Sequence, residues 1–169
     1  MRMTPRGTIG ALLAVALIGA VSLTMPFVLK ARAVAPPEVV AMHFAPYEPQ
    51  RVVYHVTDGE WFFERRFRNM LHVARNHVDA VAFGELDLRV VLQGGGVDLL
   101  LKAKSDVKLA SEIDLLRKAG VIFVVCRNTL VLRGLDPAAL HMVKREDIVA
   151  SSVAEAAARV GKGYVYMKY

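Results

Sequence analysis

The sequence predicts an α/β fold for residues 51–169, a three-layer α/β/α sandwich with a mostly parallel five-stranded sheet. Two observations predict it. Short β-branched and apolar runs alternate with stretches whose apolar residues recur at every third or fourth position, as in amphipathic helices. The run Val121–Cys126 is also apolar almost throughout, which is typical of a central strand with both faces covered. Such an alternation places a sheet between two helical layers.

Five runs have the length and composition of strands, and turn-forming residues follow the first two. Thr57, Asp58 and Gly59 follow the first run, and Gly94–Gly96 follow the second. The predicted strands are Arg51–Val56, Leu86–Leu92, Val121–Cys126, Ile148–Val149 and Tyr164–Lys168.

The stretches between these runs have the periodicity or the end signals of helices. In the longest, apolar side chains from Phe63 to Val78 lie three and four positions apart. Gly120 and Gly134 end two others, and Ser151 or Ser152 can cap the last. The predicted helices are Glu60–Asp79, Val97–Leu101, Asp106–Ala119, Asn128–Arg133, a turn from Asp136 through Met142, and a final helix through Val160.

The first 33 residues have the layout of a targeting segment. Met1–Arg6 is basic, and the following 23 residues, Gly7–Leu29, carry no charge. Because a membrane span needs about 20 residues, residues 1–33 predict either a signal peptide cleaved after Ala33 or an uncleaved N-terminal membrane anchor. In both cases we expect the remainder to be exported, to the periplasm or another extracytoplasmic space, and an anchor would hold it at the inner membrane. Residues 34–50 contain four prolines and predict a tether.

Charge and composition exclude several classes of function. Lys and Arg number 22 against 16 Asp and Glu, but residues 1–33 hold four basic and no acidic residues, which leaves 18 against 16 in the remainder. We therefore expect no nucleic-acid partner. A single cysteine excludes an internal disulfide framework and a zinc site built from several thiolates. The five histidines lack a metal-binding spacing, so we expect no metal.

The candidate site lies beyond the carboxyl ends of the predicted strands. Ligands of parallel sheets bind there, because the loops separate and helix N-termini point backbone N–H groups outward. The first three predicted strands end in residues that carry polar or reactive groups or that let the backbone approach a ligand. These residues are His55, Asp58, Gln93, Gly94, Gly95, Cys126, Arg127, Asn128 and Thr129.

Cys126 is the candidate catalytic residue. It lies at a strand-to-helix junction beside Arg127, and both positive potentials favour the thiolate, which is the nucleophilic form. The alternatives are a buried apolar cysteine that completes a core strand, and a cysteine that pairs with another chain. The run Gly94–Gly96 lacks the spacing of nucleotide-binding loops, and we expect a tight turn there rather than a phosphate site.

Four segments, VVYHVTDG, VVLQGGGVDLLL, GVIFVVCRNTLVLRGL and GKGYVYMKY, give the chain a family resemblance. It resembles the DsrE/DsrF-like family over roughly Arg51–Tyr169. The spacing from Cys126 to Arg133 and Gly134 is similar to that around the persulfide-carrying cysteine of the family's DsrE and TusD sulfur-relay subunits. The Cys-x-Asn-Thr-Leu form is more like the exported branch. The resemblance implies a three-layer α/β fold and a homo-oligomer, a trimer or a hexamer.

The resemblance also implies an activity, that of a sulfur transferase or persulfide carrier without an organic cofactor. Cys126 would accept a sulfane sulfur and exchange it with a sulfur-donor or sulfur-acceptor protein, and Arg127 would stabilise the anionic sulfur. Gln93 stands where the family often has histidine. Export would separate this chain from cytoplasmic relay partners, so we do not expect it to act in tRNA thiolation. The competing hypothesis is a non-catalytic small-ligand-binding or oligomeric assembly module, with Cys126 structural and a pocket near Asp58, Gly95 and Asn128.

Overall fold

The computed structural model describes residues 37–58, 64–82 and 84–169. The predicted leader, residues 1–33, and the predicted start of the first helix, residues 60–63, lie outside the described residues. The chain divides into two compact units, Met1–Met42 and His43–Tyr169. In the first, the described residues form one helical turn, α1 (Pro37–Val40). No helix among the described residues is long and apolar enough to cross a membrane.

The second unit begins within the stretch predicted as a tether. Tyr47 forms a parallel bridge with Val81, and its backbone N–H donates to the carbonyl of Ala80 at 2.9 Å. The first strand then starts at Gln50, one residue before the predicted start. Residues 43–50 therefore belong to the compact unit that carries the sheet.

All five strands of the sheet are parallel, which confirms the predicted fold class and sharpens it. The strand order is β4-β3-β2-β1-β5. The strands are β1 (Gln50–Val56), β2 (Leu86–Leu92), β3 (Ile122–Cys126), β4 (Ile148–Val149) and β5 (Val165–Lys168). Because β1, β2 and β3 occupy the centre, their apolar side chains are covered on both faces and supply most of the buried strand residues.

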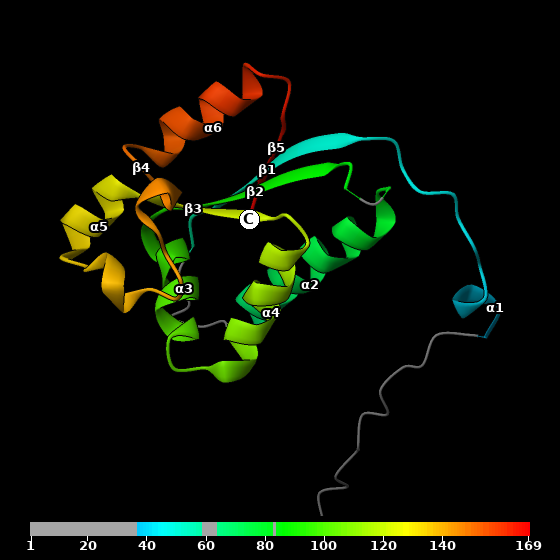
Figure 1. Ribbon diagram of the computed structural model, residues 1–169, viewed down its shortest axis with the longest axis horizontal. Helices are drawn as coiled ribbons and strands as arrows, with labels where there is room; N and C mark the ends of the chain where they lie inside the picture. The colour runs from blue at the N-terminus through cyan, green and yellow to red at the C-terminus, as the bar shows by residue number, and fades with distance from the viewer. Residues whose placement is uncertain (1–36, 59–63, 83) are drawn as a thin grey trace, which may run out of the picture. The chain divides into compact units, whose positions relative to one another are not determined.

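Helices cover the two faces of the sheet unequally (Figure 1). One face packs against α2 (Glu64–Ala80), α3 (Asp98–Ala103) and α4 (Val107–Lys118), and it holds the larger of the two apolar clusters. The other face packs under α6 (Ser152–Val160) around a small cluster that includes Val53, Val91 and Val124. Each fully buried side chain of this size contributes about 1.5–3 kcal/mol of transfer free energy. Neighbouring residues of a strand face opposite helical layers.

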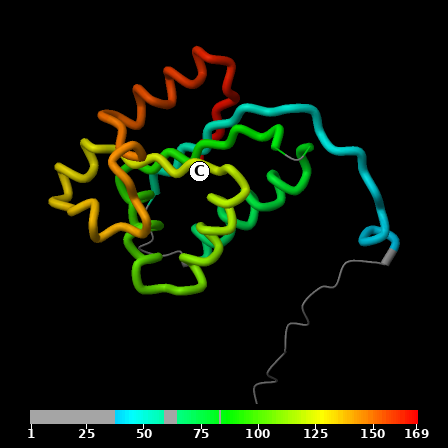
Figure 2. The backbone as a smooth tube through the Cα atoms, viewed as in Figure 1, coloured from blue at the N-terminus to red at the C-terminus, as the bar shows by residue number. Residues whose placement is uncertain are grey.

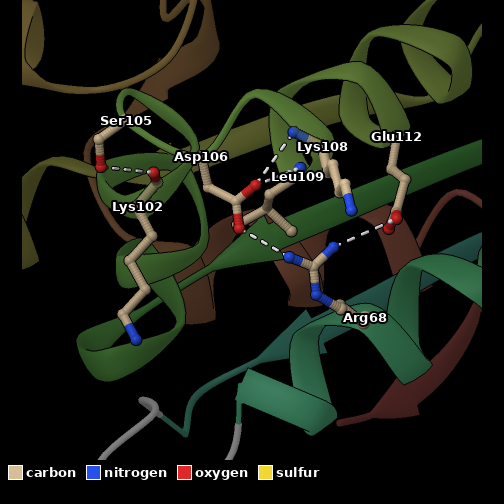
Figure 3. A network of polar contacts seen from close by, with 7 residues as sticks. All are labelled: Arg68, Lys102, Ser105, Asp106, Lys108, Leu109 and Glu112. Atoms are coloured by element: carbon tan, nitrogen blue, oxygen red, sulfur yellow. Dashed lines mark hydrogen bonds and ion pairs between the residues drawn. The ribbon is translucent and has the colours of Figure 1, made fainter.

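Polar side chains fix where α4 begins. Asp106 accepts hydrogen bonds from the backbone N–H groups of Lys108 and Leu109, both at 3.0 Å, and so caps the helix, of which the sequence predicts it to be the first residue. Arg68 on α2 reaches across to Asp106 at 2.7 Å and to Glu112 at 3.4 Å (Figure 3). The bond from the Leu109 amide, with Arg68 and the Lys108 amide, lowers the pKa of the Asp106 carboxyl. The same residue thus starts α4 and ties it to α2.

The chain leaves β3 and later returns to it (Figure 2). It enters α5 (Arg127–Arg133), which ends at Gly134 with φ of 60°, and then passes through the 3₁₀ turns η2 (Pro137–Ala139) and η3 (Arg145–Asp147) to β4 and α6. The predicted helical turn through Met142 was too long. It ends at Ala139, because Met142 has a φ of 48° and the N–H of His141 donates to the carbonyl of Leu100 instead.

The glycine run after β2 is a tight turn, as predicted. The 3₁₀ turn η1 (Gly94–Val97) begins there, and the N–H of Gly96 donates to the carbonyl of Gln93 at 2.8 Å. A Cβ on Gly96 would lie 2.2 Å from the carbonyl oxygen of Val56, so β1 can approach this turn only if residue 96 has no side chain.

We predict that Gly96→Ala lowers the free energy of unfolding by about 1–3 kcal/mol or more, because backbone must move to admit the methyl group. Gly161→Ala is the control. Its Cβ would lie 3.6 Å from its nearest neighbours, in a right-handed backbone conformation that alanine adopts readily. Urea unfolding measures both variants. Equal stabilities for the two variants would contradict the close approach at Gly96.

Candidate functional site

The carboxyl ends of the three central strands bring a thiol and several polar side chains to one edge of the sheet. Cys126 is the last residue of β3 and points to the α6 face, two residues after Val124. His55 on β1 and Gln93 after β2 lie on the same face by the same alternation, because Val53 and Val91 belong to that cluster. The alternation thus aligns three of the predicted site residues.

The N-terminus of α6 supplies the next contact. Cys126 pairs with Val149 of β4, and the chain enters α6 three residues later at Ser152. The backbone N–H of Ser152 donates to the sulfur of Cys126 at 3.5 Å. Both residues are buried, with 3% of Cys126 and 1% of Ser152 exposed. The sulfur therefore lies between the end of β3 and the start of α6.

Hydrogen-bond donors outweigh burial in setting the ionisation of Cys126. Burial raises the pKa of the thiol, while the backbone and side chain of Ser152, followed by those of Thr129, lower it. The pKa is thereby lowered from 9.0 to about 7. Thr129 accepts a hydrogen bond from the N–H of Gly94 at 3.0 Å, which leaves its own hydroxyl proton free for the sulfur. A larger fraction of this thiol is thus ionised at neutral pH than of an ordinary cysteine.

A chain of hydrogen bonds extends from Ser152 across the sheet to β5. The hydroxyl of Ser152 donates to Oε1 of Gln93 at 2.8 Å, and Nε2 of His55 lies 2.9 Å from the same oxygen. Nδ1 of His55 lies 2.9 Å from the hydroxyl of Tyr166. The network therefore connects β5, β1, β2 and α6, and it ends beside the sulfur of Cys126.

The acceptor at Gln93 decides where the protons of this network lie. An amide oxygen only accepts, so Nε2 of His55 carries a proton and donates it to Gln93. In the tautomer with its proton on Nε2, the imidazole has a lone pair on Nδ1, which accepts from the hydroxyl of Tyr166. Only 6% of His55 is exposed, so little water competes for these bonds.

His55 and Tyr166 also line a groove beside α6 with a volume of about 460 Å³. Its remaining lining residues are small or apolar: Val153, Ala156, Ala157 and Val160. The polar network therefore borders a groove with apolar side chains, and two of these side chains, Val153 and Val160, are exposed to solvent.

Other predicted site residues lie apart from the sulfur. Arg127 and Asn128 are exposed at the start of α5, and the lowered pKa of Cys126 comes from Ser152 and Thr129. The carboxylate of Asp58 is paired with Arg66 at 3.2 Å, and Asp58 lines a separate cavity of about 320 Å³. The described lining of that cavity contains neither Gly95 nor Asn128, and a pocket shared by these three residues stays a prediction.

The contacts of Arg133 give its spacing from Cys126 a structural role. One of its guanidinium nitrogens donates to the carbonyl of Gly94 at 2.8 Å, and another pairs with Asp98 at 2.6 Å. The end of α5 is thereby tied to the glycine turn whose Gly94 N–H bonds Thr129. Arg133 thus holds in place the loop that positions one of the donors to Cys126.

Sequence reasoning missed Ser152 and Tyr166 as site residues. The sequence predicts for Ser152 only a role as a helix cap, although Ser151 fills that role by accepting from the N–H of Ala154. For Tyr166 the sequence predicts only a place in the last strand. Its register was the available signal, because Tyr166 pairs with Val53, whose side chain lies on the same face as that of His55. Among residues 37–58, 64–82 and 84–169, no group of three or more His, Cys, Asp or Glu side chains could hold a metal ion.

Fold and site together define a single-cysteine α/β sandwich protein whose thiol lies at the carboxyl edge of a parallel sheet. The DsrE/DsrF-like family pattern matches residues 65–169, and the chain belongs to this family. Among solved structures, the chain is similar to MTH1491, a protein of unknown function from Methanobacterium thermoautotrophicum. The two chains share 26% sequence identity with a TM-score of 0.57, over 71% of this chain and 99% of the other. The search of curated proteins gave no match.

We predict that the alkylation rate of Cys126 by iodoacetamide rises with pH to a plateau with a midpoint near pH 7. The thiolate is the reacting form, and its donors shift its formation to lower pH. The control is the same protein in denaturant, where the donors are lost and the midpoint should lie near 9. A native midpoint at or above the denatured one would show that burial dominates over the hydrogen bonds.

Proposed function

We propose that this protein is an exported sulfur-handling protein that carries sulfane sulfur as a persulfide on Cys126. The observation that carries the proposal is the set of donors from Ser152 and Thr129 around a sulfur that is only 3% exposed. Membership of the DsrE/DsrF-like family supports the same chemistry. The uncharged run within residues 7–29 supports export, to the periplasm or another extracytoplasmic space.

The donor set separates this proposal from a merely structural cysteine. An apolar cysteine in a core needs no hydrogen-bond donors, and burial alone raises its pKa. Here Ser152 and Thr129 each contribute a backbone and a side-chain group, and their effect exceeds that of burial. A sulfur in this environment favours a negative charge, which thiolates and persulfide anions both carry.

Loading of Cys126 is a thiolate–sulfane exchange. The Cys126 thiolate attacks the outer sulfur of a donor R–S–SH, where R is an organic group or a polysulfide chain. The S–S bond of the donor breaks as the new S–S bond forms, and the electron pair leaves with R–S⁻. The transferred sulfur keeps its proton, so the product is Cys126–S–SH, which can ionise to the persulfide anion. One S–S bond is formed and one is broken, so no external oxidant is needed.

Delivery reverses the roles. An acceptor thiolate attacks the outer sulfur of the persulfide, and Cys126 leaves as a thiolate stabilised by the same donors. A pKa of about 7 suits both directions, because exchange is fastest for an attacking thiol whose pKa is close to the ambient pH and for a leaving thiol of low pKa. Sulfur-donor and sulfur-acceptor proteins are the partners that this chemistry requires.

We predict that incubation with inorganic polysulfide adds whole sulfur atoms to the intact protein and that reduction with dithiothreitol removes them. Cys126→Ser should gain none, because serine at pH 7 is not ionised. Intact-mass spectrometry of the protein recovered from the extracytoplasmic fraction makes this measurement, and the same spectrum reports whether residues 1–33 have been removed.

A denatured wild-type sample serves as the control for donor quality, because its free thiol must accept sulfur from a competent donor. An unchanged native mass together with a loaded denatured sample would overturn the proposal. It would favour the alternative of a binding or assembly module in which Cys126 is structural.

We also propose that copies of this chain associate through β5 and α6 into a homo-oligomer, a trimer or a hexamer. All four residues of β5 are exposed, and Val165, Tyr166 and Met167 form an apolar edge. Val153 and Val160 on α6 are exposed next to it. Edge strands of this composition are ordinarily covered, because their unpaired backbone groups and apolar side chains otherwise invite association.

Val165→Lys should convert an oligomer into monomers, because it places a charge in an apolar contact. Val107→Lys is the control, since Val107 is also an exposed valine and lies on α4, across the sheet from α6. Sedimentation velocity measures the mass of both variants and of the wild type. A monomeric wild type, or a Val165→Lys variant that remains assembled, would contradict the interface.

A further inference from the structure

The hydroxyl of Ser152 has one proton and two acceptors. It donates to Oε1 of Gln93 at 2.8 Å, and the backbone N–H of the same residue donates to the sulfur of Cys126 at 3.5 Å, which places the hydroxyl beside a second acceptor. The Ser152 side chain also lowers the pKa of the Cys126 thiol. We propose that Gln93 and Cys126 compete for the Ser152 proton, and that His55 and Tyr166 act as positioning residues by holding the Gln93 oxygen in place as the competitor. Gln93 thereby controls the reactivity of a thiol that it does not touch.

His55 fixes the orientation of the Gln93 carboxamide. Its Nε2–H donates to Oε1 at 2.9 Å, so turning the amide over would place NH₂ against N–H. The proton on Nε2 is itself maintained by Tyr166, whose hydroxyl donates to Nδ1 at 2.9 Å. With this orientation fixed, the atom that Gln93 presents to Ser152 is an acceptor. Each contact of the chain thus requires the next.

Charge decides the competition. When Cys126 is a neutral thiol, the amide oxygen of Gln93 is the stronger acceptor and retains the Ser152 proton. When the sulfur is a thiolate or a persulfide anion, the negative charge attracts the proton more strongly than a neutral oxygen. The rotation of one hydroxyl therefore accompanies ionisation, and Gln93 opposes it by offering Ser152 another partner.

The surroundings make this competition effective. Ser152 is 1% exposed and His55 is 6% exposed, so water does not readily take the place of a lost hydrogen-bond partner. The titratable side chains of the network besides Cys126 are His55 on β1 and Tyr166 on β5, while the charged Arg127 lies exposed at the start of α5. The N–H of Ser152 donates to the sulfur independently of its hydroxyl, so one donor remains when the hydroxyl is removed.

The inference rests on the proposed function for its biological purpose, but its test measures only ionisation. The readout is the iodoacetamide rate at pH 6, which is proportional to the thiolate fraction below the pKa, with the full pH profile beside it. Gln93→Met keeps the shape and removes the amide oxygen, so Ser152 is free for the sulfur. We expect a rate increase of about threefold or more, equivalent to about half a pKa unit.

Ser152→Ala should change the rate in the opposite direction, a decrease of about threefold or more, because the hydroxyl donor is lost. The decisive comparison is the double variant. Gln93→Met in the Ser152→Ala background should have no further effect, because the competition has no proton left to act on. His55→Phe frees the Gln93 carboxamide to turn over and should raise the rate as Gln93→Met does.

The chain contains a matched control. Gln50, His77 and Tyr54 form the same sequence of contacts on the other face of the sheet, with Nε2 of His77 2.7 Å from the Gln50 oxygen and Nδ1 2.9 Å from the Tyr54 hydroxyl. Gln50→Met therefore removes an equivalent bond away from Cys126 and should leave the alkylation rate unchanged. It shows whether the loss of any such chain alters the thiol through stability alone.

Three results would overturn the inference. They are a lower rate in Gln93→Met, an equal effect of Gln93→Met with and without the Ser152 hydroxyl, and an equal effect of Gln50→Met. If Ser152→Ala does not fold, the signs for Gln93→Met and His55→Phe still decide. Polysulfide loading reports separately on the proposed function, because a protein that takes no sulfur can still show the coupling, and a loaded protein can lack it.

Discussion

The parallel direction of all five strands is the constraint on which the rest of the structure depends. It places the carboxyl ends of β1, β2 and β3 at one edge, so residues distant in sequence meet there. The two-residue alternation then selects which side chains share a face, and it puts His55, Gln93 and Cys126 together under α6. A register shift of one residue in β2 would turn Gln93 to the opposite helical layer and break the network on both sides.

The environment of the sulfur is a balance between two opposing effects of burial. Removing the thiolate from water disfavours its charge, but a site from which water is excluded also strengthens each remaining hydrogen bond. Ser152 and Thr129 shift the balance toward the charge because their backbone N–H groups are fixed by α6 and α5. Arg133 contributes indirectly, since it ties α5 to the glycine turn that also contacts Thr129. The pKa of Cys126 is thus lowered by the donors of Ser152 and Thr129 and not by the nearby charge of Arg127.

The sequence is sufficient to predict the fold and part of the site, and the part that it does not predict has a physical explanation. Strand β2 and the helix predicted to begin at Asp106 follow from local patterns, so their predicted bounds lie close to the observed ones. Cys126 and Gln93 followed from the rule for strand ends. Ser152 did not, because its contact depends on β4 pairing with β3, and two residues of weak strand pattern do not reveal that pairing. The position of Asp58 after the first strand predicts a place in the site, although its side chain pairs with Arg66.

The two hydrogen-bonded Tyr–His–Gln sets show that the role of such a set depends on what its glutamine contacts. In both, an amide oxygen fixes the proton on Nε2 and a tyrosine hydroxyl donates to Nδ1. Burial lowers the pKa of His77, which keeps that imidazole neutral and suits a link between α2 and the first residue of β1. The chain through His55 instead ends at an oxygen that also accepts from Ser152. Ser152 contacts an ionisable sulfur, so the set through His55 controls the reactivity of the Cys126 thiol. The same bonding pattern through His77, on the other face of the sheet, only joins α2 to β1.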